Sequence, residues 1–185
     1  VVLDEAYCSF SPSSRLNLLG SFENLLVMRT MSKIGFAGIR LGMLFGNKDI
    51  VSLLNKLRLP FNVNNVSQLA GVEILDFQNT IKDKIHLVVK ERIFLIGRLN
   101  KFKGIKVYPS EANFILVNFS NYNAEHVFSH LLKAGILVKN VSSQHRLLKG
   151  CLRITVGTRD ENKELINRLS KICLLYTSDA ADDMQ

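Results

Sequence analysis

The segment at residues 28–40, MRTMSKIGFAGIR, combines a lysine, hydroxyl side chains, glycines and a closing arginine. A lysine that is held among cations and partly desolvated favours its neutral amine, and a neutral amine condenses with an aldehyde. Hydroxyl groups, a backbone made flexible by glycines and the forked donors of a guanidinium can together bind a phosphate. The segment therefore predicts that Lys33 forms a Schiff base beside a phosphate held by Thr30, Ser32 and Arg40. The alternative is a solvated loop lysine followed by a glycine turn.

A second group of polar side chains follows the apolar run at residues 1–3, which delivers Asp4, Glu5 and Tyr7. We interpret the run as a buried strand, and open α/β sheets bind their ligands at the carboxyl ends of such strands. Pyridoxal phosphate needs a carboxylate that keeps its ring nitrogen protonated and a phenol that hydrogen-bonds its phenolic oxygen. Asp4 and Tyr7 suit these two roles. The alternative is that they are ordinary strand-end and packing residues.

The third group is the segment at residues 151–158, CLRITVGT. Its apolar residues alternate with the others, as in a half-buried strand, so Arg153 is expected to face away from the apolar side. An arginine in that position offers a carboxylate or a phosphate a bidentate grip that lysine cannot match. The alternative is a surface arginine on an amphipathic strand.

Taken in chain order, these groups and the stretch Ala112-Asn113-Phe114 resemble the histidinol-phosphate aminotransferases, of class I/II within the fold type I pyridoxal-phosphate enzymes. The resemblance runs over residues 1–172. It implies that Lys33 bonds to the cofactor and moves a proton between the substrate α-carbon and the cofactor. It also implies that Asp4 contacts the pyridine nitrogen of the cofactor and that Tyr7 contacts its phenolic oxygen. The cofactor phosphate would be bound by Thr30, Ser32 and Arg40. Arg153 would bind the α-carboxylate of glutamate or 2-oxoglutarate and, in the other half-reaction, the substrate phosphate.

The resemblance implies a transaminase of histidine biosynthesis that moves the amino group between L-histidinol phosphate and 2-oxoglutarate, in a homodimer. The alternatives of the same class are another class I/II aminotransferase and a threonine-phosphate decarboxylase-like enzyme. Because the family's long N-terminal half has no counterpart here, we expect an inactive C-terminal fragment, and the alternative of another class is a catalytically silent partial domain. The family often has arginine where this chain has Lys139.

The implied fold class is α/β, with the C-terminal part of the aminotransferase large-domain mixed sheet joined to a small α/β sandwich domain. Residues 1–60 would complete the cofactor-binding large domain, 61–103 would form a helical connection, and 104–172 would form the small domain. Residues 173–185 look like the translated read-through of a sequencing adapter, so we expect a non-native tail there.

The hydrophobic periodicity and the positions of proline and glycine predict the individual elements. The expected strands are at residues 1–3, 25–28, 41–45, 106–108, 114–118, 136–138 and 153–156, and the expected helices are at 48–57, 66–77, 81–101, 124–134 and 161–171.

Composition narrows the class of protein further. The net charge of +8 raises the possibility of a nucleic-acid-binding module, but the basic residues alternate with acidic and apolar ones and form no continuous stripe, so we expect no nucleic acid partner. No apolar run reaches the roughly 20 residues of a membrane span. His126 and His130 share a helical spacing without a third ligand, so we expect no metal. Three cysteines without a paired framework favour the reducing cytoplasm.

Overall fold

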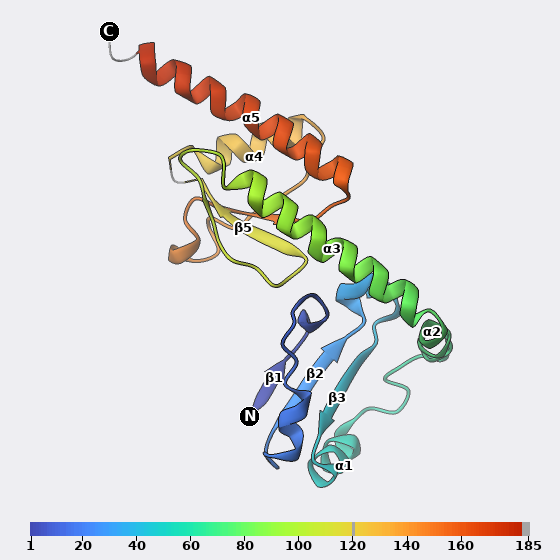
Figure 1. The fold of residues 1–185 in the computed structure, drawn as a ribbon. Helices are drawn as coiled ribbons and strands as arrows, with labels where there is room; N and C mark the ends of the chain where they lie inside the picture. Colours follow the sequence, from blue (N-terminus) through green and yellow to red (C-terminus); the bar gives the residue numbers. More distant parts are fainter. Residues whose placement is uncertain (120, 183–185) are drawn as a thin grey trace. The chain divides into compact units, whose positions relative to one another are not determined.

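The computed structural model describes residues 1–119 and 121–182, with 173–182 described by their backbone alone. The chain divides into two compact units, Val1–His86 and Leu87–Gln185, and helix α3 (Gln78–Leu99) contributes to both. Each unit contains its own sheet (Figure 1). Within the described residues, none of the helices has the length and apolar character that a membrane crossing requires.

The first unit is built on a three-stranded mixed sheet in the order β1-β2-β3. Strand β1 runs parallel to the central strand β2, and β3 runs antiparallel to it. Helices α1 and α2 are each preceded by an N-cap asparagine, Asn47 and Asn64, whose side chain accepts a hydrogen bond from a backbone N–H of the first turn. The elements of this unit are β1 (Val2–Asp4), η1 (Cys8–Phe10), η2 (Leu16–Gly20), β2 (Leu26–Thr30), η3 (Ser32–Ile34), η4 (Ala37–Ile39), β3 (Gly42–Gly46), α1 (Lys48–Leu57) and α2 (Asn65–Asp76).

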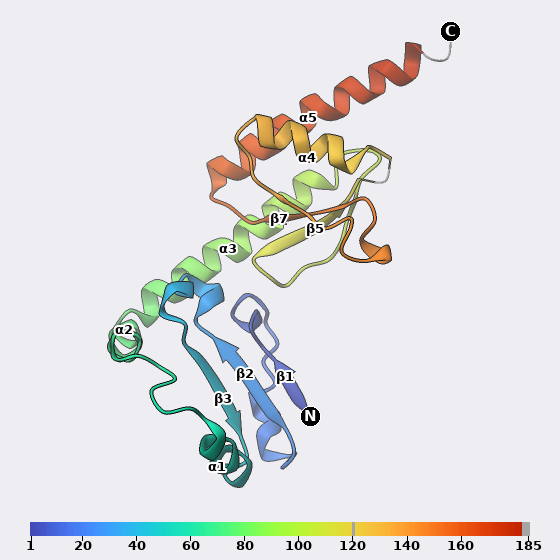
Figure 2. The ribbon, with the colours of Figure 1, turned by 180° about the vertical axis from the view of Figure 1, so that it is seen from behind.

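The second unit is a four-stranded antiparallel sheet in the order β4-β5-β7-β6, covered by helices. Alternate residues of β5 and β7, such as Ile115 and Leu152, are fully buried in a core shared with α3, α4 and α5. Helices α4 and α5 lie side by side in both views (Figures 1 and 2). The elements are β4 (Lys106–Val107), β5 (Phe114–Asn118), α4 (Ala124–Lys133), β6 (Lys139–Asn140), η5 (Arg146–Leu148), β7 (Cys151–Thr155) and α5 (Arg159–Asp182).

The mixed α/β fold is confirmed, but three local expectations are wrong. No strand forms at 136–138, because Gly135, at φ 78°, and Ile136 use their N–H groups to close the end of α4, and the chain reaches β7 only at Lys139–Asn140. Strand β1 is not buried, since it is the edge of its sheet, and Val2 is 56% exposed. The last helix continues past residue 171 to Asp182.

The short 3-10 helices between the strands were not predicted by the periodicity. The non-native tail expected at 173–185 falls on residues of which the structure describes at most the backbone, so it lies outside the described side chains.

Candidate cofactor site

Asp4 is the last residue of β1. The Ala6 backbone N–H donates to Asp4 Oδ1 at 2.9 Å, which fixes the carboxylate against the turn that follows. The Glu5 N–H donates to Met28 O at 2.8 Å, so the parallel ladder with β2 extends one residue past the strand. Asp4 itself is exposed and therefore accessible to a ligand.

Lys33 lies in η3, directly after β2, and its Nζ lies 5.2 Å from the centroid of the Tyr7 ring. Both side chains are half-buried. A lysine ammonium over the face of a tyrosine ring is attracted by the ring quadrupole, which holds the two groups in proximity. The structure therefore brings together two residues that are far apart in the sequence and that the sequence analysis placed in one site.

The two hydroxyls, of Thr30 and Ser32, bond to each other at the start of the same turn. Thr30 Oγ1 lies 3.0 Å from Ser32 Oγ, and the Ser32 backbone N–H donates to Thr30 Oγ1 at 3.1 Å. The Met31 N–H donates to Leu41 O at 3.1 Å, which closes the loop that contains Arg40. The loop thus presents hydroxyl and guanidinium groups from one short stretch of chain.

Arg40 adopts a left-handed backbone conformation, with φ of 53°, although it is not a glycine. Such a conformation is strained for an L-residue and is often retained at functional sites. The turn on the other side of the loop uses Gly35, at φ 107°, where glycine is tolerated without strain. Arg40 is exposed, so its guanidinium is available to an anion.

The residues of the first unit fit pyridoxal phosphate in their donor types and in their placement. Asp4 and Thr30 are the last residues of the neighbouring parallel strands β1 and β2, and Arg40 lies two residues before β3, which pairs with β2. A carboxylate, a phenol, an amine, hydroxyls and a guanidinium are the groups that this cofactor needs for its ring nitrogen, phenolic oxygen, aldehyde and phosphate.

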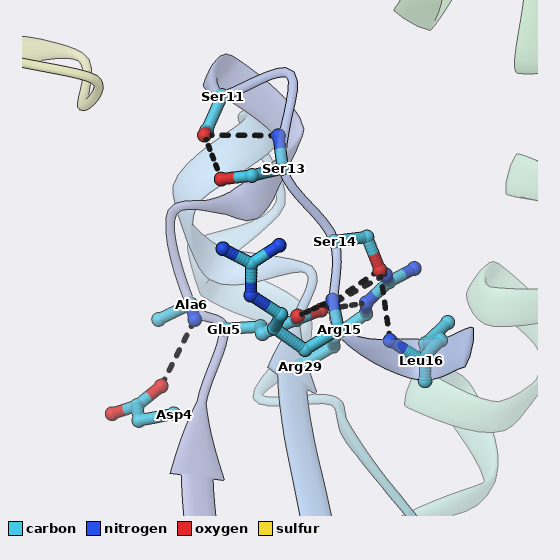
Figure 3. A network of polar contacts seen from close by, with 9 residues as sticks. All are labelled: Asp4, Glu5, Ala6, Ser11, Ser13, Ser14, Arg15, Leu16 and Arg29. Carbon is cyan, nitrogen blue, oxygen red and sulfur yellow. Dashed lines mark hydrogen bonds and ion pairs between the residues drawn. The ribbon is translucent and has the colours of Figure 1, made fainter. Parts of the chain in front are cut away.

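An ion pair between buried Glu5 and half-buried Arg29 lies beside Asp4, and the sequence analysis did not identify it (Figure 3). Burial raises the pKa of Glu5, but hydrogen bonds from the Arg15 backbone N–H and the Arg29 guanidinium outweigh that effect and bring the pKa below its ordinary value. Burial also raises the pKa of the nearby Cys8 thiol, so Cys8 is a poor nucleophile. The available signal was the acidic residue directly after Asp4, but nothing in the sequence links it to Arg29.

Arg153 belongs to the second unit, where it lies in β7 between the core residues Leu152 and Ile154. Its guanidinium carbon lies 5.1 Å from the centroid of the Phe114 ring, and its Nε is buried without a hydrogen-bond partner in the described chain. Lys139 is its cross-strand neighbour in β6. Two cations directly opposite each other repel, and a buried donor without a partner is costly, so this surface suits an anionic ligand.

Comparison with known proteins identifies the family of this chain. The family model described as aminotransferase class I and II matches residues 1–169. The histidinol-phosphate aminotransferase of Vesicomyosocius okutanii is 43% identical over 175 residues, which are 95% of this chain and 49% of that protein. The chain therefore spans about half the length of such curated relatives.

Solved structures of the same family share the fold. The crystal structure of histidinol-phosphate aminotransferase from Clostridium acetobutylicum matches with a TM-score of 0.84 and 26% identity, over 93% of this chain and 53% of that one. The enzyme from Sinorhizobium meliloti, in complex with pyridoxal-5'-phosphate, matches with a TM-score of 0.77 and 26% identity, over 95% of this chain and 49% of that one. Because the family model matches most of its length, this chain belongs to the class I and II aminotransferases.

Proposed function

We propose that the protein represented by this chain is a pyridoxal-phosphate-dependent transaminase that moves the amino group between L-histidinol phosphate and 2-oxoglutarate. The observation that carries the proposal is the approach of Lys33 Nζ to within 5.2 Å of the Tyr7 ring centroid, next to the strand end that bears Asp4. The names of the relatives at 43% identity support the choice of substrate. The histidine-biosynthesis role follows from that substrate.

When bound, pyridoxal phosphate supplies a ring that accepts electrons from the substrate's α-carbon. Lys33 would hold the cofactor aldehyde through Nζ and would move the substrate's α-proton. Asp4 would keep the ring nitrogen protonated, because an ionised carboxylate favours the charged form of its partner. Tyr7 would donate its hydroxyl to the phenolic oxygen, and the loop of Thr30, Ser32 and Arg40 would hold the phosphate.

We assign to Arg153 the α-carboxylate of glutamate or 2-oxoglutarate and, in the other half-reaction, the phosphate of the substrate. Its unpartnered Nε supports this role, because an anion would satisfy the donor and offset the repulsion between Arg153 and Lys139. A lysine opposite Arg153 adds positive charge without supplying a second fork.

We propose domain boundaries for the chain that match those of an aminotransferase. Residues 1–60 would complete the cofactor-binding large domain, 61–103 would connect, 104–172 would form the small domain, and 173–185 would be non-native. We also propose a homodimer for the whole protein. Cys8 and Cys151 are both free thiols, which supports a reducing compartment such as the cytoplasm.

The test is covalent capture of the cofactor by the purified chain. Pyridoxal phosphate is added, the absorbance spectrum is recorded, borohydride is used to fix bound cofactor, and the labelled peptides are mapped. We expect label on Lys33, its loss in Lys33→Ala, and no change in the control Lys82→Ala, which alters an exposed lysine of the same unit. Uniform weak labelling of many lysines would contradict an organised site in this chain.

A further inference from the structure

We infer that the ion pair between Glu5 and Arg29 is a positioning device that holds the turn bearing Asp4 and Tyr7 in register with the strand that leads to Lys33. The inference rests on the proposed function, because the pair would act through those three residues and would not touch the cofactor itself.

The Glu5 carboxylate is the centre of a dense set of hydrogen bonds (Figure 3). Its Oε2 accepts from Arg29 Nε at 3.1 Å and from Arg29 Nη2 at 2.9 Å, and Ser14 Oγ approaches the same oxygen at 3.4 Å. Its Oε1 accepts from the Arg15 backbone N–H. Arg29 Nη2 also donates to Ser14 Oγ at 2.6 Å. One side chain therefore joins three segments of the first unit.

The pair is placed where the backbone ladder between β1 and β2 ends. The last backbone bond of that ladder is from Glu5 N to Met28 O. After it, the backbone bonds from Cys8 N to Glu5 O and from Phe10 N to Tyr7 O stay within the turn. The Glu5 side chain consequently extends the connection to β2 one residue beyond the ladder, at Arg29.

Glu5 and Arg29 are both close in sequence to residues of the proposed cofactor site. Tyr7 follows Glu5 by two residues and Lys33 follows Arg29 by four, so a shift of the turn along β2 would change the 5.2 Å approach of Lys33 to Tyr7. The Glu5 side chain is only 8% exposed and that of Arg29 26%. Because a buried carboxylate is costly unless it is fully hydrogen-bonded, one geometry of the turn is strongly preferred.

A charged pair is not needed merely to fill this space, since apolar residues of similar volume often stabilise a protein as well as a buried ion pair does. What the guanidinium adds is direction, because its Nε and Nη2 donors converge on Glu5 Oε2 and so orient the carboxylate. A positioning role therefore predicts that Arg29→Lys, which keeps the charge but loses the guanidinium fork, loosens the turn and reduces labelling of Lys33 almost as much as Arg29→Met does. A purely electrostatic or space-filling role predicts that lysine rescues.

The first measurement is amide hydrogen exchange of the purified chain without cofactor. In Glu5→Gln and Arg29→Lys we expect exchange to accelerate on the order of tenfold at residues 5–10 and at Arg15, with Val27 and Phe45 unchanged. The matched control is Glu164→Gln, which breaks the exposed pair of Glu164 and Arg168 in α5. Unchanged exchange at residues 5–10, or acceleration throughout the first unit, would overturn the inference.

The second measurement is borohydride-fixed labelling of Lys33 across a pH series. We expect Glu5→Gln and Arg29→Lys to reduce selective labelling of Lys33 about tenfold. Rescue by lysine at position 29 would overturn the inference. If the unaltered chain shows no selective labelling, the organised cofactor site proposed for this chain fails, whereas the exchange experiment still judges the pair because it needs no cofactor.

Discussion

The phenol of Tyr7 and its ring can be tested separately at the scale of single residues. Tyr7→Phe keeps the aromatic face that lies 5.2 Å from Lys33 Nζ and removes the hydroxyl proposed for the cofactor's phenolic oxygen. We expect Lys33 to remain the labelled lysine, with a changed absorbance maximum and a shifted pH midpoint for capture, measured by spectrophotometric titration. Tyr108→Phe is the matched control, because Lys106 lies 4.9 Å from that ring in the other unit. An unchanged titration in Tyr7→Phe would remove the phenol from the site.

Arg153 is tested in a whole protein in which this chain is joined to the N-terminal half of a close relative. Replacement by lysine removes the bidentate fork, and hydrogen bonds to charged groups contribute about 1.5–3 kcal/mol. We therefore expect Arg153→Lys to weaken kcat/KM for glutamate about tenfold to a hundredfold, with cofactor capture at Lys33 nearly unchanged. Equal losses in glutamate use and in cofactor binding would contradict the substrate role.

The types of the site residues could be predicted from the sequence, but their partners could not. Lys33, Asp4 and Arg40 stand in segments whose chemistry and order resemble a family, which is local information. The pairing of Glu5 with Arg29 depends on the parallel register that sets Asp4 opposite Met28. That register is a tertiary property, so no spacing along the chain indicates it.

At the scale of elements, the turn between β7 and α5 is held by a buried amide. Asn162, 2% exposed, accepts from the Gly157 N–H at 3.1 Å and donates to Gly157 O at 3.0 Å and to Glu91 Oε2 at 3.2 Å. Glu91 also pairs with Arg159 at 2.9 Å. We expect Asn162→Ala to reduce the free energy of unfolding by about 2–4 kcal/mol, because it leaves buried polar groups unpaired.

Urea unfolding followed by circular dichroism would measure this loss. Asn167→Ala is the matched control, since Asn167 is an exposed asparagine of the same helix. A loss in Asn162→Ala no larger than that of the control would show that the amide does not hold the turn.

The start of α5 gives a pH prediction. The Thr158 backbone N–H and, next in importance, the Thr158 hydroxyl donate to Glu161 and lower its pKa below the ordinary value of 4.5. A carboxylate with a lowered folded-state pKa contributes stability above its unfolded pKa and loses it as the pH falls through the folded value. We expect Glu161→Gln to flatten the dependence of unfolding free energy on pH below about pH 5. A Glu161→Gln slope equal to that of the unaltered chain would contradict the capping role.

The elements themselves were predicted where one local signal dominates. Helix α1 and strand β5 have the expected bounds, because Asn47 caps the helix and a short apolar run at residues 114–117 marks the strand. Strand β6 was placed at 136–138 on its apolar residues, whereas pairing with β7 begins only at Lys139. Apolar character indicates burial, and Val138 is buried, but burial alone does not specify which residues join a ladder.

At the scale of the whole molecule, the two units differ sharply in how much apolar surface they bury. The contiguous core of sixteen buried residues, from Leu95 to Ile172, belongs entirely to the second unit. In the first unit, apolar residues on and between α1 and α2 stay exposed, among them Leu57 at 80% and Phe61 at 94%. The described chain therefore leaves apolar surface of the first unit uncovered.

This difference predicts that the two units unfold separately, with the first unit unfolding at lower urea concentration. Hydrophobic burial is the dominant stabilising term, and local stability follows the number of buried apolar contacts. Each unit contains a free thiol that can report on it, half-buried Cys8 in the first and fully buried Cys151 in the second. In a Cys173→Ser background, pulsed thiol labelling along a urea series should modify Cys8 at a lower concentration than Cys151. Rates would be normalised to the unfolded chain, because the raised pKa of Cys8 slows its intrinsic reaction. Coincident labelling transitions would mean that both units unfold as one cooperative body, in which case the exposed apolar surface of the first unit does not limit its stability.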